Sequence, residues 1–479
     1  MGNAIDRSRF SPDDFRRFSA RLRNETLLLR DWLRSGQLAD EPARAGYEVE
    51  AWLIDHNWRP APRNAAFLKK LDDPHVVHEL AQFNVELNGT PHWLRDQPFT
   101  AMAGDLEALW SHCRQVADGM SLQPLMIGIL PSARQEDLGL DRMTGADRYR
   151  ALNEQILQLR SRRPLRIDIA NGDEAVHLER ADVMLEAAST SLQLHLQLTT
   201  ANAARCFNAA VIMSAATVAV AANSPLLFGQ LLWEETRIPL VEQAVAVDPV
   251  DGNQGPGSLR RATFGSGYAR DALYQLFVEN RQHYPVLLPV IKDDPVERLA
   301  HLSLHNGTIW RWNRPLIGAD AQGRCHLRLE HRVMSAGPSI VDMTANAAFF
   351  HGLVQACLLR DQPLETEIPF AVAERNFYRA AREGLAAEME WLGGSRVPLR
   401  ELILESLIPK ARRGLEQLDL PASEYGPWLE IIEARVRTGR TGAAWQRAWV
   451  HRHGRDMQGL VAAYWQRQRG GAPVHEWEL

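Results

Sequence analysis

The chain has 479 residues, 45% of them hydrophobic and 24% charged, which is the composition of a folded globular protein. Its 32 glycines and 26 prolines are ordinary numbers, so collagen, a long coiled coil and wholesale disorder are excluded. The 54 basic and 59 acidic residues give a formal charge of −5, too balanced for a general binder of phosphate backbones, so no nucleic-acid partner is expected.

Neither export nor a membrane span is expected. The first residues lack the apolar region of a signal peptide, and the longest apolar stretch, about residues 209–222, is too short for a bilayer and fits a buried helix. The cysteines show no metal-finger or CxxC spacing, which favours packed thiols in a reducing cytoplasm. They are Cys113, Cys206, Cys325 and Cys357.

An amphipathic helix is predicted at the start of the chain. Ser11-Pro12-Asp13-Asp14 combines a capping hydroxyl, a proline in the first turn and acids near the helix dipole. Apolar residues then follow at helical spacing. They are Phe15, Phe18, Leu22, Leu29 and Leu33.

Four later segments, within residues 46–55, 81–89, 190–198 and 325–333, alternate between apolar and polar residues, which is typical of strands with one buried face. A doubly wound parallel sheet would bury both faces of its strands. The pattern therefore predicts an α+β fold with a curved, mainly antiparallel sheet that helices cover on one face. The polar faces carry Glu48, Glu50, Glu86, Gln193, His195, Arg328, Glu330 and Arg332.

Helices are predicted near residues 100–120, 144–158, 201–222 and 341–360, where they would cover the apolar face. From about residue 370 onward the sequence is helix-like and rich in arginine, glutamate and tryptophan. The expected organisation is a catalytic domain over residues 1–369 with a helical C-terminal region, 370–479, packed on it. The segment 251–270 is rich in glycine and arginine, and we expect either a lid over the site or a plain surface loop.

The polar strand faces gather carboxylates. One Glu-x-Glu pair is more often a solvated strand face than a ligand pair, but recurrence on neighbouring strands favours a cation site, because close carboxylates repel one another. Oxygen ligands with a single imidazole suit Mg²⁺ or Mn²⁺. The candidate metal ligands are Glu48, Glu50, Glu79, Glu86, His195 and Glu330.

Arginines near these acids indicate an anionic ligand. Arg332 shares a strand face with Glu330, where it can bind phosphate oxygens or pair with the glutamates. Arg237, Arg311 and Arg314 are expected outside the acidic face, and a surface salt bridge is the first interpretation for each alone. Acids for metal and arginines for anions together predict a site for ATP and a carboxylate substrate.

The order of these motifs resembles the glutamate-cysteine ligase and carboxylate-amine ligase family, whose members share the catalytic fold of glutamine synthetase. The motifs, within residues 40–360, are GYEVEAW, HELAQFNVELNGTP, TSLQLHLQL, AANSPLLFGQ with EETR, NGTIWRWNRP and LRLEHRV. The resemblance implies the metal ligands named above, with Arg332 and Arg237 as catalytic arginines that hold phosphate or substrate carboxylate. It also implies nucleotide contacts from Arg332, Arg314 and Gln193.

The activity that the resemblance implies is ATP-dependent ligation with Mg²⁺ or Mn²⁺. A carboxylate, in the first instance the γ-carboxylate of glutamate, is activated as an acyl phosphate and joined to an amine. Thr236 rather than serine precedes Arg237, and Arg332 lacks the usual acidic continuation, which leaves the acceptor open among cysteine, another amino acid, an alkylamine and an aromatic amine.

Two alternatives stay open from the residues alone. One is a phosphotransferase related to guanidino kinases, and the other is a non-catalytic ATP-binding regulatory protein on the same fold. In each case we expect small-molecule ligands, a cytoplasmic location and, by analogy, a homodimer.

Overall fold

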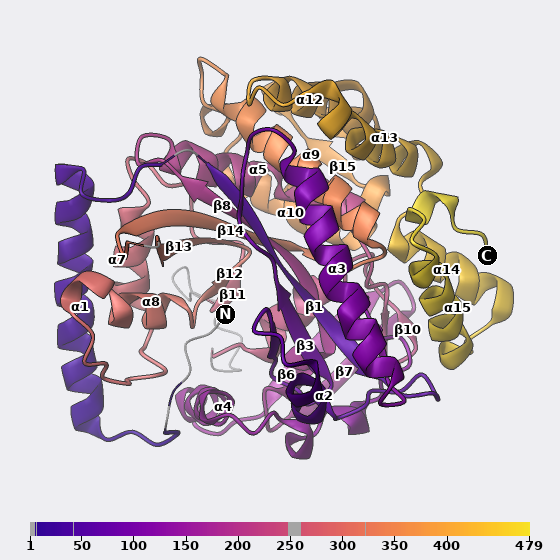
Figure 1. Ribbon diagram of the computed structural model, residues 1–479, viewed down its shortest axis with the longest axis horizontal. Helices are drawn as coiled ribbons and strands as arrows, with labels where there is room; N and C mark the ends of the chain where they lie inside the picture. Colours follow the sequence, from indigo (N-terminus) through magenta and orange to yellow (C-terminus); the bar gives the residue numbers. More distant parts are fainter. Residues whose placement is uncertain (1–4, 6, 42, 248–259, 321) are drawn as a thin grey trace.

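A curved sheet forms the centre of the computed structural model, which describes residues 5, 7–41, 43–247, 260–320 and 322–479 (Figure 1). Over these residues the sheet has eight strands in the order β13-β14-β8-β1-β3-β2, with β4 and β5 also paired to β1. Each of these pairings is antiparallel, as predicted. The strands are β1 (Arg44–Ile54), β2 (Val76–His78), β3 (Asn84–Asn88), β4 (His92–Trp93), β5 (Gln123–Leu125), β8 (Ser191–Leu198), β13 (Asn313–Ala319) and β14 (Cys325–Ser335).

Helices α3 (Pro98–Asp118), α5 (Ala203–Val220) and α9 (Ile340–Leu358) lie on the apolar face of the sheet, close to the predicted positions (Figure 1). Helix α5 packs against β14 on one side and α9 on the other. It is long and apolar enough to cross a membrane, but 89% of that window is buried inside the protein. A helix that is apolar all round is expected at the centre of a core, and α5 has that place.

The C-terminal region is helical, with α10 (Phe370–Glu383), α11 (Leu399–Leu402), α12 (Ile408–Glu416), α13 (Ala422–Thr438), α14 (Gly442–His453) and α15 (Met457–Gly470). A short hairpin, β15 (Glu388–Glu390) and β16 (Arg396–Pro398), follows α10. Helices α12 and α13 pack on α9, and α10 packs on α5, so this region shares the apolar core of the sheet. A buried ion pair between Arg435 and Asp342, at 2.7 Å, joins α13 to α9.

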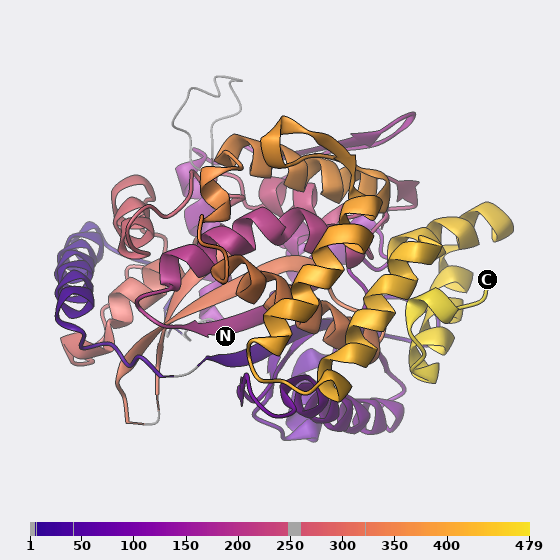
Figure 2. The same cartoon turned by 90° about the horizontal axis from the view of Figure 1, so that it is seen from above.

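Helix α1 (Pro12–Ser35) lies at the opposite end of the long axis from α14 and α15 (Figures 1 and 2). It begins with the predicted capping box between Ser11 and Asp14. The helix packs against α7 (Tyr274–His283) and α8 (Ala300–Asn306), where the buried Glu25 accepts a 2.7 Å hydrogen bond from the backbone of Leu302. It thereby holds α8, whose residues form one wall of the cavity described below.

The polar face of the sheet is covered rather than open to solvent. Above it lie α4 (Asp147–Leu159), α6 (Arg237–Ala244), α8 and a short 3₁₀-helix (Met184–Ala188). The helix predicted near residues 144–158 is therefore present as α4, but the prediction that it covers the apolar face is wrong, because its side chains line the cavity on the polar face. Strand β8 is buried along its whole length for this reason, including the polar residues that alternate with its leucines. The remaining elements are α2 (Asn64–Leu71), β6 (Leu165–Asn171), β7 (Glu174–Arg180), β9 (Leu226–Leu227), β10 (Gln230–Leu231), β11 (Ala262–Thr263) and β12 (Trp310–Arg311).

Two further expectations concern loops and thiols. Residues 251–259 of the predicted lid or surface loop lie outside the described residues. The rest of that segment is packed into the fold, since β11 pairs with β12 and the fully buried Arg261 donates a 2.9 Å hydrogen bond to the carbonyl of Thr308. The four cysteines are buried and unpaired, as predicted.

Candidate active site

A cavity of about 340 Å³ lies on the polar face of the sheet. All the predicted metal ligands line it, together with Gln193, Arg314 and Arg332. The carboxylates in its wall are Glu48, Glu50, Glu79, Glu86, Glu186 and Glu330, and the cations are Arg148, Arg314, Arg328 and Arg332. Residues from positions 48 to 332 of the chain are thus brought into one chamber.

Strand register explains this assembly. Residues opposite each other on antiparallel strands point to the same face, so polar residues with a period of two on each strand form a continuous patch. Strand β1 lies between β8 and β3, and β14 follows β8. The cross-strand pairs are Glu50 with Glu86, Glu48 with Gln193, and Glu330 with His195.

Three of these residues have the geometry of a metal site. One ligand atom from each of Glu48, His195 and Glu330 lies within 4.8 Å of the other two. The Nε2 atom of His195 is 3.3 Å from a carboxylate oxygen of Glu48. The Nδ1 atom of His195 is buried and makes no hydrogen bond among the described residues, which is costly without a ligand. A hard divalent cation such as Mg²⁺ or Mn²⁺ fits this set of donors.

The neighbouring carboxyls have raised pKa values. Burial raises the pKa of Glu86 to about 7, with a further contribution from the charge of Glu48. Burial and the charge of Glu50 raise the pKa of Glu186 to about 7 as well. For Glu79, burial and the nearby glutamates raise the pKa well above its usual value. Protons therefore offset part of the negative charge here, and a bound cation would replace them.

Glu50 is held in a defined orientation. One carboxylate oxygen accepts a 2.7 Å hydrogen bond from the backbone N–H of Ser191, and the other accepts a 2.9 Å bond from the Gln193 side chain. Burial raises the pKa of Glu50, although Arg332 and Arg237 act in the opposite direction. Gln193, expected from the resemblance to bind nucleotide, thus contacts a candidate metal ligand.

Glu330 is bound by arginine on both oxygens. The Nε and Nη2 atoms of Arg314 each lie 2.8 Å from one of them, and Nη1 of Arg332 is 3.6 Å away. Burial acts to raise the pKa of Glu330. The charges of Arg314, Arg332 and His195 outweigh this effect and lower the pKa to about 2. The expectation that Arg314 lies outside the acidic face is wrong, because β13 pairs with β14 and places Arg314 directly opposite Glu330.

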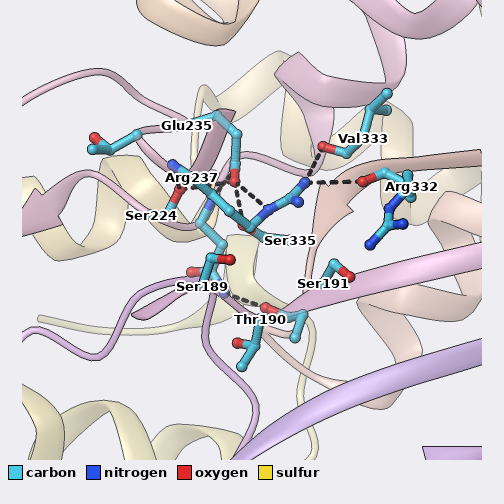
Figure 3. A network of polar contacts seen from close by, with 12 residues as sticks. Ser189, Thr190, Ser191, Ser224, Glu235, Arg237, Arg332, Val333 and Ser335 are labelled. Carbon is cyan, nitrogen blue, oxygen red and sulfur yellow. Dashed lines mark hydrogen bonds and ion pairs between the residues drawn. The ribbon is translucent and has the colours of Figure 1, made fainter. Parts of the chain in front are cut away.

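The other two predicted cations lie elsewhere. Arg311 is buried beside α7, where it donates hydrogen bonds of 2.6 Å to Glu279 and 2.9 Å to Asn280. It is therefore not a surface residue. Arg237 is also buried, behind β14, and is not among the described residues that line the cavity (Figure 3). Its contacts are considered below.

Several cavity residues escaped the sequence analysis as site candidates. Glu186 lies in a 3₁₀-helix, and Arg148 and Tyr149 lie in the first turn of α4, so no strand alternation marks them. Arg328 stands on the predicted polar face of β14, and the same two-residue period that identified Glu330 and Arg332 was available to identify it.

Apolar side chains complete the cavity on two sides. One group belongs to α4, α6 and the segments beside them, and consists of Leu80, Leu152, Ile156, Val183, Val241 and Val245. The other belongs to α8, β12 and β13, and consists of Leu304, Trp310, Leu316 and Ile317. The charged residues on the sheet are thus accompanied by two groups of apolar side chains, which can hold apolar parts of ligands.

A comparison with protein-family models matches residues 44–463 to glutamate-cysteine ligase family 2 (GCS2). The chain belongs to this family. The match confirms the family predicted from the motifs, and it continues past residue 369 into the helical C-terminal region. A search of curated proteins by sequence finds no match.

Solved structures agree on the fold. A glutamate–cysteine ligase from Francisella tularensis, in complex with AMP, aligns with a TM-score of 0.57 over 89% of both chains at 14% identity. A bifunctional glutathione synthetase from Pasteurella multocida aligns with a TM-score of 0.54 at 11% identity, over 93% of this chain and 54% of that one. The predicted fold class, a curved, mainly antiparallel sheet with helices and a helical C-terminal region, is confirmed.

Proposed function

We propose that this protein is an ATP-dependent carboxylate–amine ligase that activates the γ-carboxylate of glutamate and joins it to an amine. The observation that carries the proposal is a single cavity, in a chain of the GCS2 family, that combines buried carboxylates, one histidine and several arginines. The carboxylates suit divalent cations, and the arginines suit phosphate and carboxylate groups.

The residues divide into two roles under this proposal. Glu48, His195 and Glu330 would hold one cation, and the carboxylates of Glu50, Glu79 and Glu86 would hold others. Bound Mg²⁺ or Mn²⁺ would neutralise the phosphates of ATP during transfer. Arg332 and Arg314 would bind the phosphate oxygens, adding fixed positive charge where negative charge develops.

The reaction has two balanced steps. A carboxylate oxygen of glutamate attacks the γ-phosphorus of ATP, and the bond from that phosphorus to the bridging oxygen of ADP breaks. The amine nitrogen then attacks the acyl carbon, and the carbon–oxygen bond to phosphate breaks. The amine gives up a proton in this second step, and Glu186, a cavity carboxyl with a pKa of about 7, is suited to accept it.

The two apolar surfaces suggest how the substrates are arranged. The surface beside Trp310 adjoins Arg314 in sequence and would hold the adenine of ATP. The surface formed by Leu152, Ile156 and Val241 would hold the acceptor, since the 3₁₀-helix that carries Glu186 packs against α6. We therefore propose an acceptor amine with an apolar substituent. Only small-molecule partners are proposed, and the unpaired thiols fit the cytoplasmic location expected from the sequence.

The test is ADP release by purified protein supplied with Mg·ATP and glutamate, with and without pooled amines. Products are analysed by mass spectrometry. A product with the mass of glutamate plus amine minus water, absent with Glu50→Gln, supports the proposal and identifies the acceptor. Glu433→Gln is the matched control, because Glu433 makes only an exposed ion pair with Arg437 on α13.

Other outcomes favour the alternatives. A stable phosphorylated acceptor without an amide product indicates a phosphotransferase. Tight ATP binding without ADP release in any pool contradicts the ligase proposal and indicates a regulatory protein.

A further inference from the structure

A buried polar network lies behind the wall of the cavity, centred on Glu235 (Figure 3). The Glu235 carboxylate accepts hydrogen bonds from the backbone N–H of Asn223 at 3.0 Å, the Ser224 hydroxyl at 2.8 Å, the Ser335 hydroxyl and Nε of Arg237 at 3.2 Å. These residues belong to the sequence motifs AANSP and EETR and to the end of β14. A fully buried carboxylate with this many donors is rigidly oriented.

Arg237 extends the network to the backbone of β14. Its Nη2 atom donates to the carbonyl of Val333 at 2.6 Å and lies 3.2 Å from the carbonyl of Arg332 (Figure 3). Its guanidinium carbon is 5.3 Å from the ring centre of Trp312. One guanidinium therefore links Glu235 to two consecutive carbonyls of a strand.

Those carbonyls belong to a β-bulge. His331 pairs with Leu194 and Met334 pairs with Leu192, so two residues of β14 stand opposite the single position of Gln193. A bulge interrupts the ladder and changes the direction of its side chains. Arg237 donates hydrogen bonds to both carbonyls of this bulge and so stabilises the irregular backbone.

The bulge also contributes a side chain to the cavity wall, that of Arg332. The side chain of Arg332 leaves it toward the cavity and lies beside Glu330, while its backbone N–H donates a 3.0 Å hydrogen bond to the carbonyl of Trp312. Opposite the bulge, Gln193 holds Glu50. The direction of Arg332 thus depends on a backbone irregularity that Arg237 and Glu235 stabilise from behind.

We propose that Glu235 and Arg237 are positioning residues that hold the β14 bulge and thereby aim Arg332 at an anionic ligand, which neither of them touches. Arg237 thus acts through the backbone of β14. The family resemblance had implied a different role, direct binding of phosphate or substrate carboxylate. The inference rests on the proposed function only for the identity of the ligand, the phosphates of Mg·ATP.

The first test is a double-mutant cycle on Mg·ATP binding, measured by calorimetry with the full chain. Glu235→Gln keeps the size of the side chain but loses its charge, and we expect it to weaken binding about tenfold. In an Arg332→Ala background the same change is expected to have no further effect, because Arg332 is the residue through which Glu235 acts. An equal loss in both backgrounds would overturn the proposal.

Arg237→Lys separates positioning from direct contact. Lysine keeps a positive charge but lacks the fork that reaches Glu235 and the two carbonyls, so we expect it to lose as much binding as Arg237→Ala. If lysine retains most of the affinity and the effect adds to that of Arg332→Ala, Arg237 contacts the ligand itself.

Two further variants distinguish the positioning role from a general loss of fold stability. Asp342→Asn removes a charge from a comparably buried ion pair with Arg435, and it is expected to lower the melting temperature without changing Mg·ATP binding. Ser335→Ala deletes one hydrogen bond to Glu235 and serves as a milder variant if Glu235→Gln fails to fold.

A crystal structure of Glu235→Gln decides the matter without reference to any activity. We expect the Arg332 guanidinium to move away from Glu330 and the register of β14 against β8 to change at the bulge. An unchanged Arg332 would overturn the inference. If the wild-type protein does not bind Mg·ATP, the proposed function fails, and this structure alone tests the positioning role.

Discussion

Glu186 is the residue that most clearly separates the two halves of the proposed reaction. It is a partly buried carboxyl near Glu50 and Arg332, with a pKa of about 7, and it lines the cavity together with apolar side chains. A carboxyl of that pKa exchanges protons readily at neutral pH. Under the proposed mechanism, this pKa suits the step in which the amine loses a proton.

We therefore expect Glu186→Gln to slow amide formation by roughly 10²-fold or more while leaving acyl phosphate formation nearly intact. Rapid-quench measurement of the first ADP turnover, compared with steady-state product formation, distinguishes the two steps. Glu179→Gln is the matched control, since Glu179 lies exposed on β7 and pairs with Arg166. Equal loss of both steps would show that Glu186 has another role, such as metal binding.

At the scale of elements, the pairing of β13 with β14 sets Arg314 against a candidate metal ligand. Both oxygens of Glu330 accept hydrogen bonds from Arg314. A cation that binds Glu330 must compete with this guanidinium, which can in turn move to the phosphates of a bound nucleotide. The same ion pair therefore links metal binding to nucleotide binding.

Arg314→Met is expected to tighten Mn²⁺ binding about tenfold in the absence of nucleotide and to weaken Mg·ATP binding by a similar factor. The first effect follows from freeing Glu330 and the second from losing a phosphate contact. Electron paramagnetic resonance titration of free Mn²⁺ measures the first, and calorimetry the second. If both affinities fall together, Arg314 only maintains the shape of the site.

A second feature at the scale of elements is the contact between helices α9 and α12. Their close approach depends on two glycines, Gly352 and Gly414. A Cβ atom at Gly414 would lie 2.1 Å from the carbonyl oxygen of Gly352 and 2.8 Å from the backbone nitrogen of Ala356. Backbone atoms inside helices cannot move aside easily. The crossing carries the C-terminal region onto the core, so the substitution strains a large interface.

We expect Gly414→Ala to destabilise the fold by about 1–3 kcal/mol, the usual cost of overpacking. Thermal unfolding followed by circular dichroism measures this as a lower melting temperature. Gly426→Ala in α13 is the control, because its Cβ would meet nothing within 4 Å and alanine favours a helix. A Gly414→Ala protein as stable as the wild type would mean that the two helices separate at little cost.

For the whole molecule, the parts that sequence could predict are those with a regular period. Alternation in β1, β3, β8 and β14 identified the sheet, and the same alternation identified Glu48, Glu50 and Glu330 as neighbours. The surroundings of Arg314 were mispredicted because residues 313–319 were not recognised as a strand, so the hairpin that pairs them with β14 was missed. Glu186 and Glu235 lie in short irregular segments without a regular period, and only the three-dimensional structure shows that Glu186 lines the cavity and that Glu235 is buried behind it.

The candidate metal ligands come from positions 48 to 330 of the chain, so a cation that binds them joins distant segments. We therefore expect the bound metal to stabilise the entire fold. In the metal-free protein, Glu86 and Glu186 have pKa values of about 7, above the usual value of 4.5. Raised carboxyl pKa values contribute stability at low pH, and this contribution is lost as the pH rises from about 4.5 through about 7. Mg²⁺ binds the ionised carboxylates, so its stabilising effect grows over the same range.

We expect saturating Mg²⁺ to raise the melting temperature slightly at about pH 6 and clearly at about pH 8, with a gain near 2.7 kcal/mol at a hundredfold excess over Kd. Burial lowers the pKa of His331 and His351 to about 3. Protonation of these two histidines therefore destabilises the folded protein in acid, with or without metal. Comparing samples with and without Mg²⁺ at each pH removes their contribution. Glu86→Gln is expected to reduce the Mg²⁺ effect at the higher pH. An equal shift with sodium chloride of matched ionic strength would indicate charge screening instead of a bound cation.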